Sequence, residues 1–251
     1  GYRCRHRAGH GHAGERDTPT MTDPLPKDWT AFWNDRADLE NDFSATGRGG
    51  TDEAEFLYTV REVIQTLDLQ RDDVVLDIGC GAGLISLAMS PLVAAIKGID
   101  LSPKLVERAR NKLQGVSNVT FDAGSITETG EVESSYTKVL AYSVLQYLDG
   151  EDAARQACAE VARILAPGGR GLLAANPDPV RRTLCEKRVI ENTPENKQKE
   201  SLTLLDHVLW LSPERLEELA RESGLEAKAI AISPRIRQHF YMYDLVVTKH
   251  G

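Results

Sequence analysis

The stretch that decides the fold lies between residues 73 and 102. Residues 73–84 read DVVLDIGCGAGL, and residues 96–102 read IKGIDLS. The first apolar run ends in three glycines spaced two residues apart, and the second ends in Asp100. A continuous apolar run is typical of a central strand covered on both faces, and glycine lets the chain turn tightly beside a ligand. The pattern predicts a strand–helix–strand unit with a nucleoside site at the carboxyl ends of its strands.

The rest of the chain repeats this alternation of strand and helix. Apolar runs predict seven strands, at residues 74–78, 94–99, 119–121, 139–142, 171–175, 225–232 and 239–248. Helices are expected between them, at residues 51–67, 83–89, 151–165 and from residues 103 and 213 onward. The crossovers predict an α/β fold, a Rossmann-like, doubly wound, mostly parallel sheet with an antiparallel last strand. The last two strands are close in sequence and are expected to form a hairpin at the edge of the sheet.

The N-terminal segment predicts a further helix over residues 28–42. Trp29, Phe32 and Trp33 fall on one side of it at helical spacing. Two interpretations remain open: the helix packs on the main domain, or it is a lid that closes over a ligand pocket. After a glycine-punctuated loop, Thr51 is expected to cap the helix that leads into the first strand.

The chain also divides into segments of different character. Residues 1–20 hold four arginines and three histidines with little apolar content, which predicts a disordered leader or appended sequence. Residues 21–50 are expected to hold the lid helix and its loop, and residues 51–251 the main domain. Residues 180–211 break the alternation and predict an insertion on the substrate side, mobile in its polar part at 191–198.

Composition restricts the function classes. The net charge of −8 gives no support to nucleic-acid binding, which depends on basic residues against phosphates. No run of about 18 uncharged apolar residues exists, so no membrane span is expected. The four cysteines show no paired spacing, which predicts free thiols in a cytoplasmic protein and no metal site.

The glycine spacing separates two kinds of nucleotide site. A redox dinucleotide fold uses G-x-G-x-x-G, because its pyrophosphate lies on the helix N-terminus. Here the third glycine is Gly83 and position 84 is Leu. This spacing offers no evident phosphate site and favours a nucleoside without a diphosphate, whose ribose hydroxyls Asp100 can bind.

These motifs resemble the class I S-adenosylmethionine-dependent methyltransferases of the small-molecule type. Residues 75–83 are similar to the first motif of that family and residues 98–103 to its second-strand motif, while residues 165–169 resemble the turn before its fifth strand. The resemblance covers about residues 56–248. It implies S-adenosyl-L-methionine as cofactor and S-adenosyl-L-homocysteine as product.

Carried over by position, the resemblance also implies site residues. Asp77, Gly79 and Gly81 would hold the methionine moiety, Asp100 the ribose and Leu101 one face of adenine. Ser125 stands where the family often has an acid that contacts the adenine amino group. The expected cofactor-binding set is Asp77, Gly79, Cys80, Gly81, Asp100, Leu101, Gly124, Ser125, Ile126 and Tyr142.

The methyl acceptor is expected beside the segment that follows the fourth strand. The catalytic candidates there are Tyr142, Gln146 and Tyr147, with simple packing as the open alternative for each. The substrate-binding candidates are Trp33, Arg235, Arg237, His239 and Tyr241. The arginines, together with Arg181 and Arg182, are either solvated charges or the binding site for a carboxylate or phosphate on the acceptor.

The leading interpretation is methyl transfer to an oxygen or nitrogen of a small metabolite by a monomer or homodimer. No general base motif is needed for it, because a base acts only where the acceptor must lose a proton. Two alternatives are an NAD(P)-dependent oxidoreductase and a non-catalytic, cofactor-binding partner subunit. The sequence does not name the acceptor.

Overall fold

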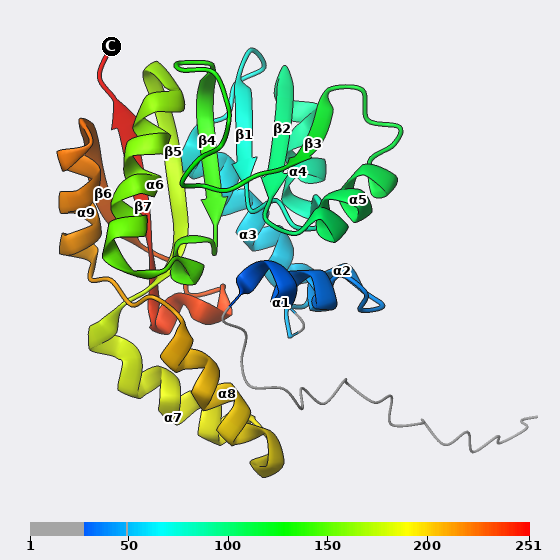
Figure 1. The fold of residues 1–251 in the computed structure, drawn as a ribbon, viewed down its shortest axis with the longest axis vertical. Coiled ribbons are helices and arrows are strands. Elements are labelled where there is room, and N and C mark those ends of the chain that lie inside the picture. The colour runs from blue at the N-terminus through cyan, green and yellow to red at the C-terminus, as the bar shows by residue number, and fades with distance from the viewer. Residues whose placement is uncertain (1–27, 49) are drawn as a thin grey trace, which may run out of the picture.

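A computed structural model describes residues 28–48 and 50–251 (Figure 1). The leader expected over residues 1–20 lies outside the described residues, as do residues 21–27 of the expected lid segment. Within the described part of the chain, no helix is long and apolar enough to cross a lipid bilayer.

The described residues form one seven-stranded sheet. Its strands are β1 Val74–Ile78, β2 Ala95–Asp100, β3 Val119–Ala123, β4 Tyr136–Tyr142, β5 Leu165–Pro177, β6 Leu225–Ala231 and β7 Met242–Lys249. The order across the sheet is β3-β2-β1-β4-β5-β7-β6. The first five strands pair in parallel, and β7 pairs antiparallel with both β5 and β6. The predicted Rossmann-like sheet with an antiparallel last strand is confirmed.

The last two strands form the expected antiparallel hairpin at one edge of the sheet. Strand β7 lies between β5 and β6, so β6 is the outermost strand on this side. Residues 239–241 were expected in this strand, but a 3₁₀ turn, η4 Arg237–Phe240, precedes it. Strand β5 is longer than expected at both ends. Leu165 already pairs with Tyr136 of β4 before a register shift, and Asn176 and Pro177 still pair with β7.

Helices cover both faces of the sheet. Helices α6 Gly150–Ile164 and α9 Pro213–Glu222 pack on one face, in the larger core cluster. Helices α3 Glu53–Leu67 and α4 Leu84–Met89, followed by the 3₁₀ turn η1 Ser90–Leu92, pack on the other. Helix α5 Pro103–Lys112 packs on β2 and β3 through Phe121. The doubly wound arrangement follows from the apolar runs of β1 and β4, which are buried on both faces.

The start of α3 corrects one expected cap. The helix begins at Glu53 with Asp52, not Thr51, as its N-cap. The Asp52 carboxylate accepts a hydrogen bond from the Glu55 amide at 2.7 Å. A carboxylate at this position satisfies a free amide and also interacts favourably with the helix dipole.

The N-terminal segment forms two short helices instead of the single one expected over residues 28–42. They are α1 Trp29–Arg36 and α2 Asp42–Ala45. The Arg108 guanidinium of α5 binds the carbonyl oxygens of Ala37 and Leu39 at 2.7 and 2.6 Å. Because these carbonyl oxygens accept hydrogen bonds from Arg108, they do not accept the backbone hydrogen bonds that would continue α1. Both helices lie at the carboxyl ends of β1 and β2 (Figure 1).

The insertion at 180–211 is helical. After the 3₁₀ turn η3 Pro179–Arg181, it forms α7 Arg182–Asn192 and α8 Glu195–His207, which lie beyond the same end of the sheet (Figure 1). The segment 191–198, expected to be a mobile polar stretch, instead ends α7 and begins α8. The Gln198 amide donates to the carbonyls of Ile190 and Thr193, both at 3.0 Å, which fixes the corner between the two helices.

Candidate active site

A cleft opens at the carboxyl ends of the parallel strands. Its volume is about 960 Å³ including the open mouth. The loops that follow β1, β2, β3 and β4 line it, together with Trp33 of α1, residues 46–48 and Gln238 of η4. This is the place where ligands bind in open parallel sheets.

The glycine turn after β1 forms one wall of the cleft. Gly79 and Gly81 have φ angles of 67° and 55°, a left-handed region that other residues rarely adopt. A Cβ atom on Gly79 would lie 2.4 Å from Cγ2 of Val144, and one on Gly81 would lie 2.7 Å from Cγ2 of Thr46. The turn therefore presents bare backbone to the cleft, as the sequence predicted.

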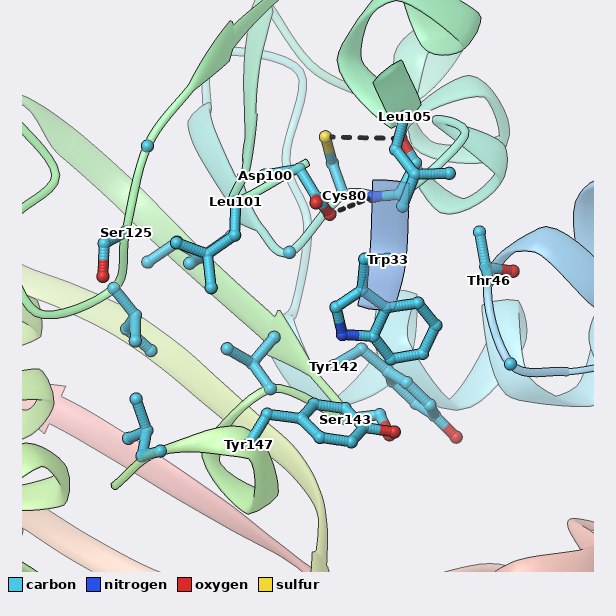
Figure 2. Close-up of a pocket in the computed structure, with 18 of the residues that line it drawn as sticks. Trp33, Thr46, Cys80, Asp100, Leu101, Leu105, Ser125, Tyr142, Ser143 and Tyr147 are labelled. Atoms are coloured by element: carbon cyan, nitrogen blue, oxygen red, sulfur yellow. Dashed lines mark hydrogen bonds between the residues drawn. The ribbon is translucent and has the colours of Figure 1, made fainter. Parts of the chain in front are cut away.

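Asp100 is held in the wall of the cleft by the backbone. Its carboxylate accepts hydrogen bonds from the amides of Gly81 and Ser102, both at 2.9 Å. Figure 2 shows the bond from Gly81 as a dashed line at the Asp100 carboxylate. Burial raises the pKa of Asp100, and these two hydrogen bonds act in the opposite direction. Each carboxylate oxygen accepts only one of these bonds and has a second lone pair available for a ligand hydroxyl.

Asp77 lies behind the glycine turn and is not one of the residues lining the cleft. Its side chain is 2% exposed and accepts a hydrogen bond from the Ser86 hydroxyl at 2.5 Å. Burial raises the pKa of Asp77 to about 6, against the opposing effects of Ser86 and the Arg48 charge. The contact of Asp77 with a methionine moiety stays a prediction.

The raised pKa of Asp77 predicts a stability difference that depends on pH. The folded state binds this proton more tightly than the unfolded chain, so the stabilisation is complete below pH 3.8 and is lost as the pH rises to about 6. We expect Asp77→Asn to be more stable than the wild type by about 3 kcal/mol at neutral pH. Below pH 3.8 the two proteins should be equally stable. Chemical denaturation at both pH values measures this, and a difference that does not change with pH would contradict it.

The residues predicted to enclose an adenine lie together in the lining of the cleft. Leu101, Gly124, Ser125 and Ile126 all line the cleft, at the ends of β2 and β3. Leu101 is 40% exposed although its side chain is large and apolar. The Ser125 hydroxyl lies 2.9 Å from Oγ1 of Thr127, within its own loop. An apolar side chain exposed in a cleft is available to cover the flat face of a ligand.

Aromatic rings form the other end of the cleft. Trp33, Tyr142 and Tyr147 converge there (Figure 2). The Tyr147 ring lies between the rings of Trp29 and Trp33, at centroid distances of 4.6 and 5.2 Å. Burial raises the pKa of Tyr142 to about 12 and also raises that of Tyr147, so both phenols are neutral hydrogen-bond donors at physiological pH.

Gln146 acts from behind this aromatic end and does not line the cleft. Its side-chain amide donates to the Ser143 hydroxyl at 2.7 Å. Hydrogen bonds from Gln146 and Ser143 also lower the pKa of Tyr147, which places the three polar groups together. The arrangement suits Gln146 for orienting Tyr147 rather than for contacting a ligand.

Four predicted substrate residues are not among the residues that line the cleft. The Arg235 guanidinium lies over the Tyr58 ring at 4.5 Å, and the Arg237 amide donates to the Glu55 carboxylate at 2.6 Å. His239 lies 2.8 Å from the Ile236 carbonyl through Nδ1, and the Tyr241 ring packs 6.3 Å from Trp210. Each of these four residues, in the segment between β6 and β7, therefore has a contact elsewhere in the protein. Their role in acceptor binding stays a prediction.

The two arginines of the insertion also have partners elsewhere. Arg181 pairs with Asp178 at 3.5 Å, and Arg182 pairs with Glu186 at 2.9 Å and with Asp206. Among the predicted substrate residues, Trp33 is the one that the structure brings into the cleft.

Several lining residues were not among the predicted site residues, although Ser143 and Val144 belong to the segment that was expected beside the acceptor. They are Thr46, Gly47, Arg48, Ile78, Leu105, Ser143, Val144, Leu148 and Gln238. Arg48 matters most, because its guanidinium lies over the Tyr142 ring at 4.8 Å and lowers the pKa of Asp77 electrostatically. The one sequence signal was its glycine-punctuated loop, which gave no indication of where the loop packs.

Comparison with known proteins agrees with this geometry. Residues 75–169 match a family model described as a methyltransferase domain. Over 124 residues the chain is 36% identical to an uncharacterized methyltransferase, YcgJ, of Bacillus subtilis, covering 47% of each chain. Over 102 residues it is 36% identical to a ubiquinone biosynthesis O-methyltransferase of Xanthomonas oryzae, covering 40% of this chain and 41% of that one. The chain thus matches less than half the length of these curated relatives.

A solved structure extends the similarity to nearly the whole fold. The N-methyltransferase NodS from Bradyrhizobium japonicum, crystallised with S-adenosylhomocysteine, superposes with a TM-score of 0.63 at 16% identity. The match covers 88% of this chain and 97% of NodS. The family resemblance drawn from the motifs is therefore confirmed: residues 75–169 match a methyltransferase domain, within a chain that has the fold of the class I S-adenosylmethionine-dependent methyltransferases.

Proposed function

We propose that this chain transfers a methyl group from S-adenosylmethionine to an oxygen or nitrogen of a small molecule. The observation that carries the proposal is one cleft that joins a nucleoside-shaped wall to an aromatic end. The glycine turn, Asp100 and Leu101 form the wall, and Trp33 with Tyr147 forms the end. The named relatives are methyltransferases, and no comparison favours a nicotinamide enzyme.

The cofactor is assigned to the nucleoside-shaped wall. Asp100 would bind the ribose hydroxyls, and Leu101 and Ile126 would enclose the adenine. The bare backbone of Gly79 and Gly81 leaves room for the methionine end. Arg48, beside that turn, is the cation available for the methionine carboxylate. When bound, the cofactor supplies an electrophilic methyl group on a sulfonium.

The aromatic end is assigned to the acceptor. Trp33, Tyr142 and Tyr147 exclude water and restrict a flat or apolar molecule, and such orientation can contribute about 7–11 kcal/mol in favourable systems. The phenols of Tyr142 and Tyr147 remain protonated and can donate a hydrogen bond to an oxygen of the methyl acceptor. Among the described lining residues, Asp100 is the one acid and it lies on the cofactor side. This charge distribution favours a neutral or anionic acceptor over an ammonium compound.

The partners and location expected from the sequence are part of the same proposal. We infer a small-molecule acceptor, with neither nucleic acid nor a membrane as partner, and a monomer or homodimer in the cytoplasm. Among the described lining residues Arg48 is the one cation, so a carboxylate or phosphate on the acceptor would share it with the methionine carboxylate.

Transfer of an isotope-labelled methyl group tests the proposal. The protein is incubated with labelled S-adenosylmethionine and a metabolite extract, and small molecules are separated and analysed by mass spectrometry. We expect protein-dependent label in a small molecule, retained in the control Asp122→Asn, which changes an exposed acid outside the cleft. Binding of S-adenosylhomocysteine without any labelled product would instead support a non-catalytic partner subunit.

A further inference from the structure

A chain of hydrogen bonds links helix α1 to the carboxylate assigned to the ribose. The Ser102 hydroxyl donates to Oδ1 of Asn34 at 2.7 Å, and the Ser102 amide donates to Oδ1 of Asp100 at 2.9 Å. The other Asp100 oxygen accepts from the Gly81 amide at 2.9 Å. The chain thus runs from a helix that covers the cleft to the glycine turn beneath it.

The Ser102 hydroxyl uses its single proton and one of its two lone pairs in this arrangement. Its hydroxyl oxygen already accepts from the Leu105 amide at 3.1 Å, as the N-cap of α5. The hydroxyl has a single proton to donate, and Asn34 receives it. Ser102 is fully buried, so without Asn34 this proton would face a buried site with no acceptor, which is costly.

Asn34 lies next to Trp33, which lines the cleft, and one helix therefore contacts both ends of the site. The Trp33 ring contacts the Tyr147 ring at the acceptor end of the cleft, and Asn34 accepts a hydrogen bond from Ser102 on the cofactor side. Separate contacts fasten the same segment to α5. Arg108 binds the carbonyls of Ala37 and Leu39 and pairs with Asp42 at 2.7 Å.

We propose that Asn34 is a positioning residue for Asp100, and that it acts through Ser102 to aim the carboxylate at the ribose hydroxyls. Helix α1 is then more than a cover, because its docking sets the geometry of the cofactor wall. The inference rests on the proposed function, since it assumes that Asp100 binds a ribose.

The alternative is a purely structural role, in which Asn34 only anchors helix α1 to the N-terminus of α5. The two roles differ in which ligand atoms sense the loss of Asn34. An anchor affects every ligand in the cleft equally, whereas a positioning residue affects ligands through the hydroxyl groups that Asp100 binds. Arg108→Gln is the matched control, because it weakens the anchoring of the same segment without touching the chain from Asn34 to Asp100.

The experiment measures dissociation constants of the full chain for S-adenosylhomocysteine and for its analogue that lacks both ribose hydroxyls. We expect Asn34→Ala to weaken S-adenosylhomocysteine about tenfold and the analogue less than about twofold. Arg108→Gln should weaken both ligands by the same factor. Asn34→Asp keeps an acceptor oxygen for Ser102 and should restore most of the affinity. Thermal melting confirms that each variant is folded.

Two results would overturn this inference and leave the proposed function unaffected. One is an Asn34→Ala variant that weakens both ligands equally, and the other is a variant that weakens neither. A wild-type chain that does not prefer S-adenosylhomocysteine over the analogue would remove the ribose role of Asp100 and the inference with it. A wild-type chain that binds neither ligand would instead contradict the proposed function itself, and the variants would not be needed to show it.

Discussion

Replacing Asp100 by Asn should raise the dissociation constant for S-adenosylhomocysteine about hundredfold, since hydrogen bonds to a charged group contribute about 1.5–3 kcal/mol each. The carboxylate offers free lone pairs on both oxygens, while its other two bonds go to the amides of Gly81 and Ser102. An amide in its place turns one acceptor into a donor that faces a backbone amide. The variant therefore loses a ribose contact and also loosens the glycine turn.

Isothermal titration of the variant against S-adenosylhomocysteine measures the effect. Asp122→Asn is the control, because Asp122 is an acid at the end of the neighbouring strand β3 that is exposed and ion-paired with Lys97 and Arg110. The control should bind as the wild type does. Unchanged affinity of a folded Asp100→Asn variant would place the ligand elsewhere in the cleft.

Gly79→Ala is expected to reduce S-adenosylhomocysteine binding by more than about hundredfold. The added methyl would lie 2.4 Å from Cγ2 of Val144, and the φ angle of 67° is already unfavourable for alanine. Val144 belongs to the segment after β4 that lines the cleft, so relief of the clash moves two walls of the site at once.

Gly130→Ala separates the backbone effect from the effect on the site. Gly130 has a φ angle of 73° and open space around its would-be Cβ, and it does not line the cleft. Both variants should lose about 1–2 kcal/mol of stability from the left-handed backbone. Only Gly79→Ala should lose ligand binding. If the two variants bind S-adenosylhomocysteine equally well, the glycine turn does not form the binding wall.

The sheet and the cofactor wall could be predicted from the sequence because they depend on local patterns. The apolar run of β1, the glycine spacing after it and Asp100 at the end of β2 are all within 30 residues of one another. The resemblance to the methyltransferase family then also implied residues 124–126. Local pattern and topology agreed in this half of the chain.

The packing of the segments around the mouth of the cleft could not be predicted, because it depends on contacts between residues far apart in the sequence. The helix expected over residues 28–42 is interrupted where Arg108, far along the chain, binds the Ala37 carbonyl. Arg235, a substrate-binding candidate, is not among the described lining residues, and its guanidinium lies over the Tyr58 ring on α3. Arg48 does line the cleft, from a glycine-punctuated loop whose pattern gave no indication of where it packs. A sequence shows which side chains are charged but not which partner each one meets.

The proposed function requires that the cleft binds the nucleoside of a methyl donor and not a redox dinucleotide. An equilibrium titration of the full chain with S-adenosylhomocysteine and, separately, with NADH distinguishes the two ligands. We expect saturable binding of S-adenosylhomocysteine at micromolar concentrations and no saturable binding of NADH. Saturable binding of NADH without binding of S-adenosylhomocysteine would contradict it.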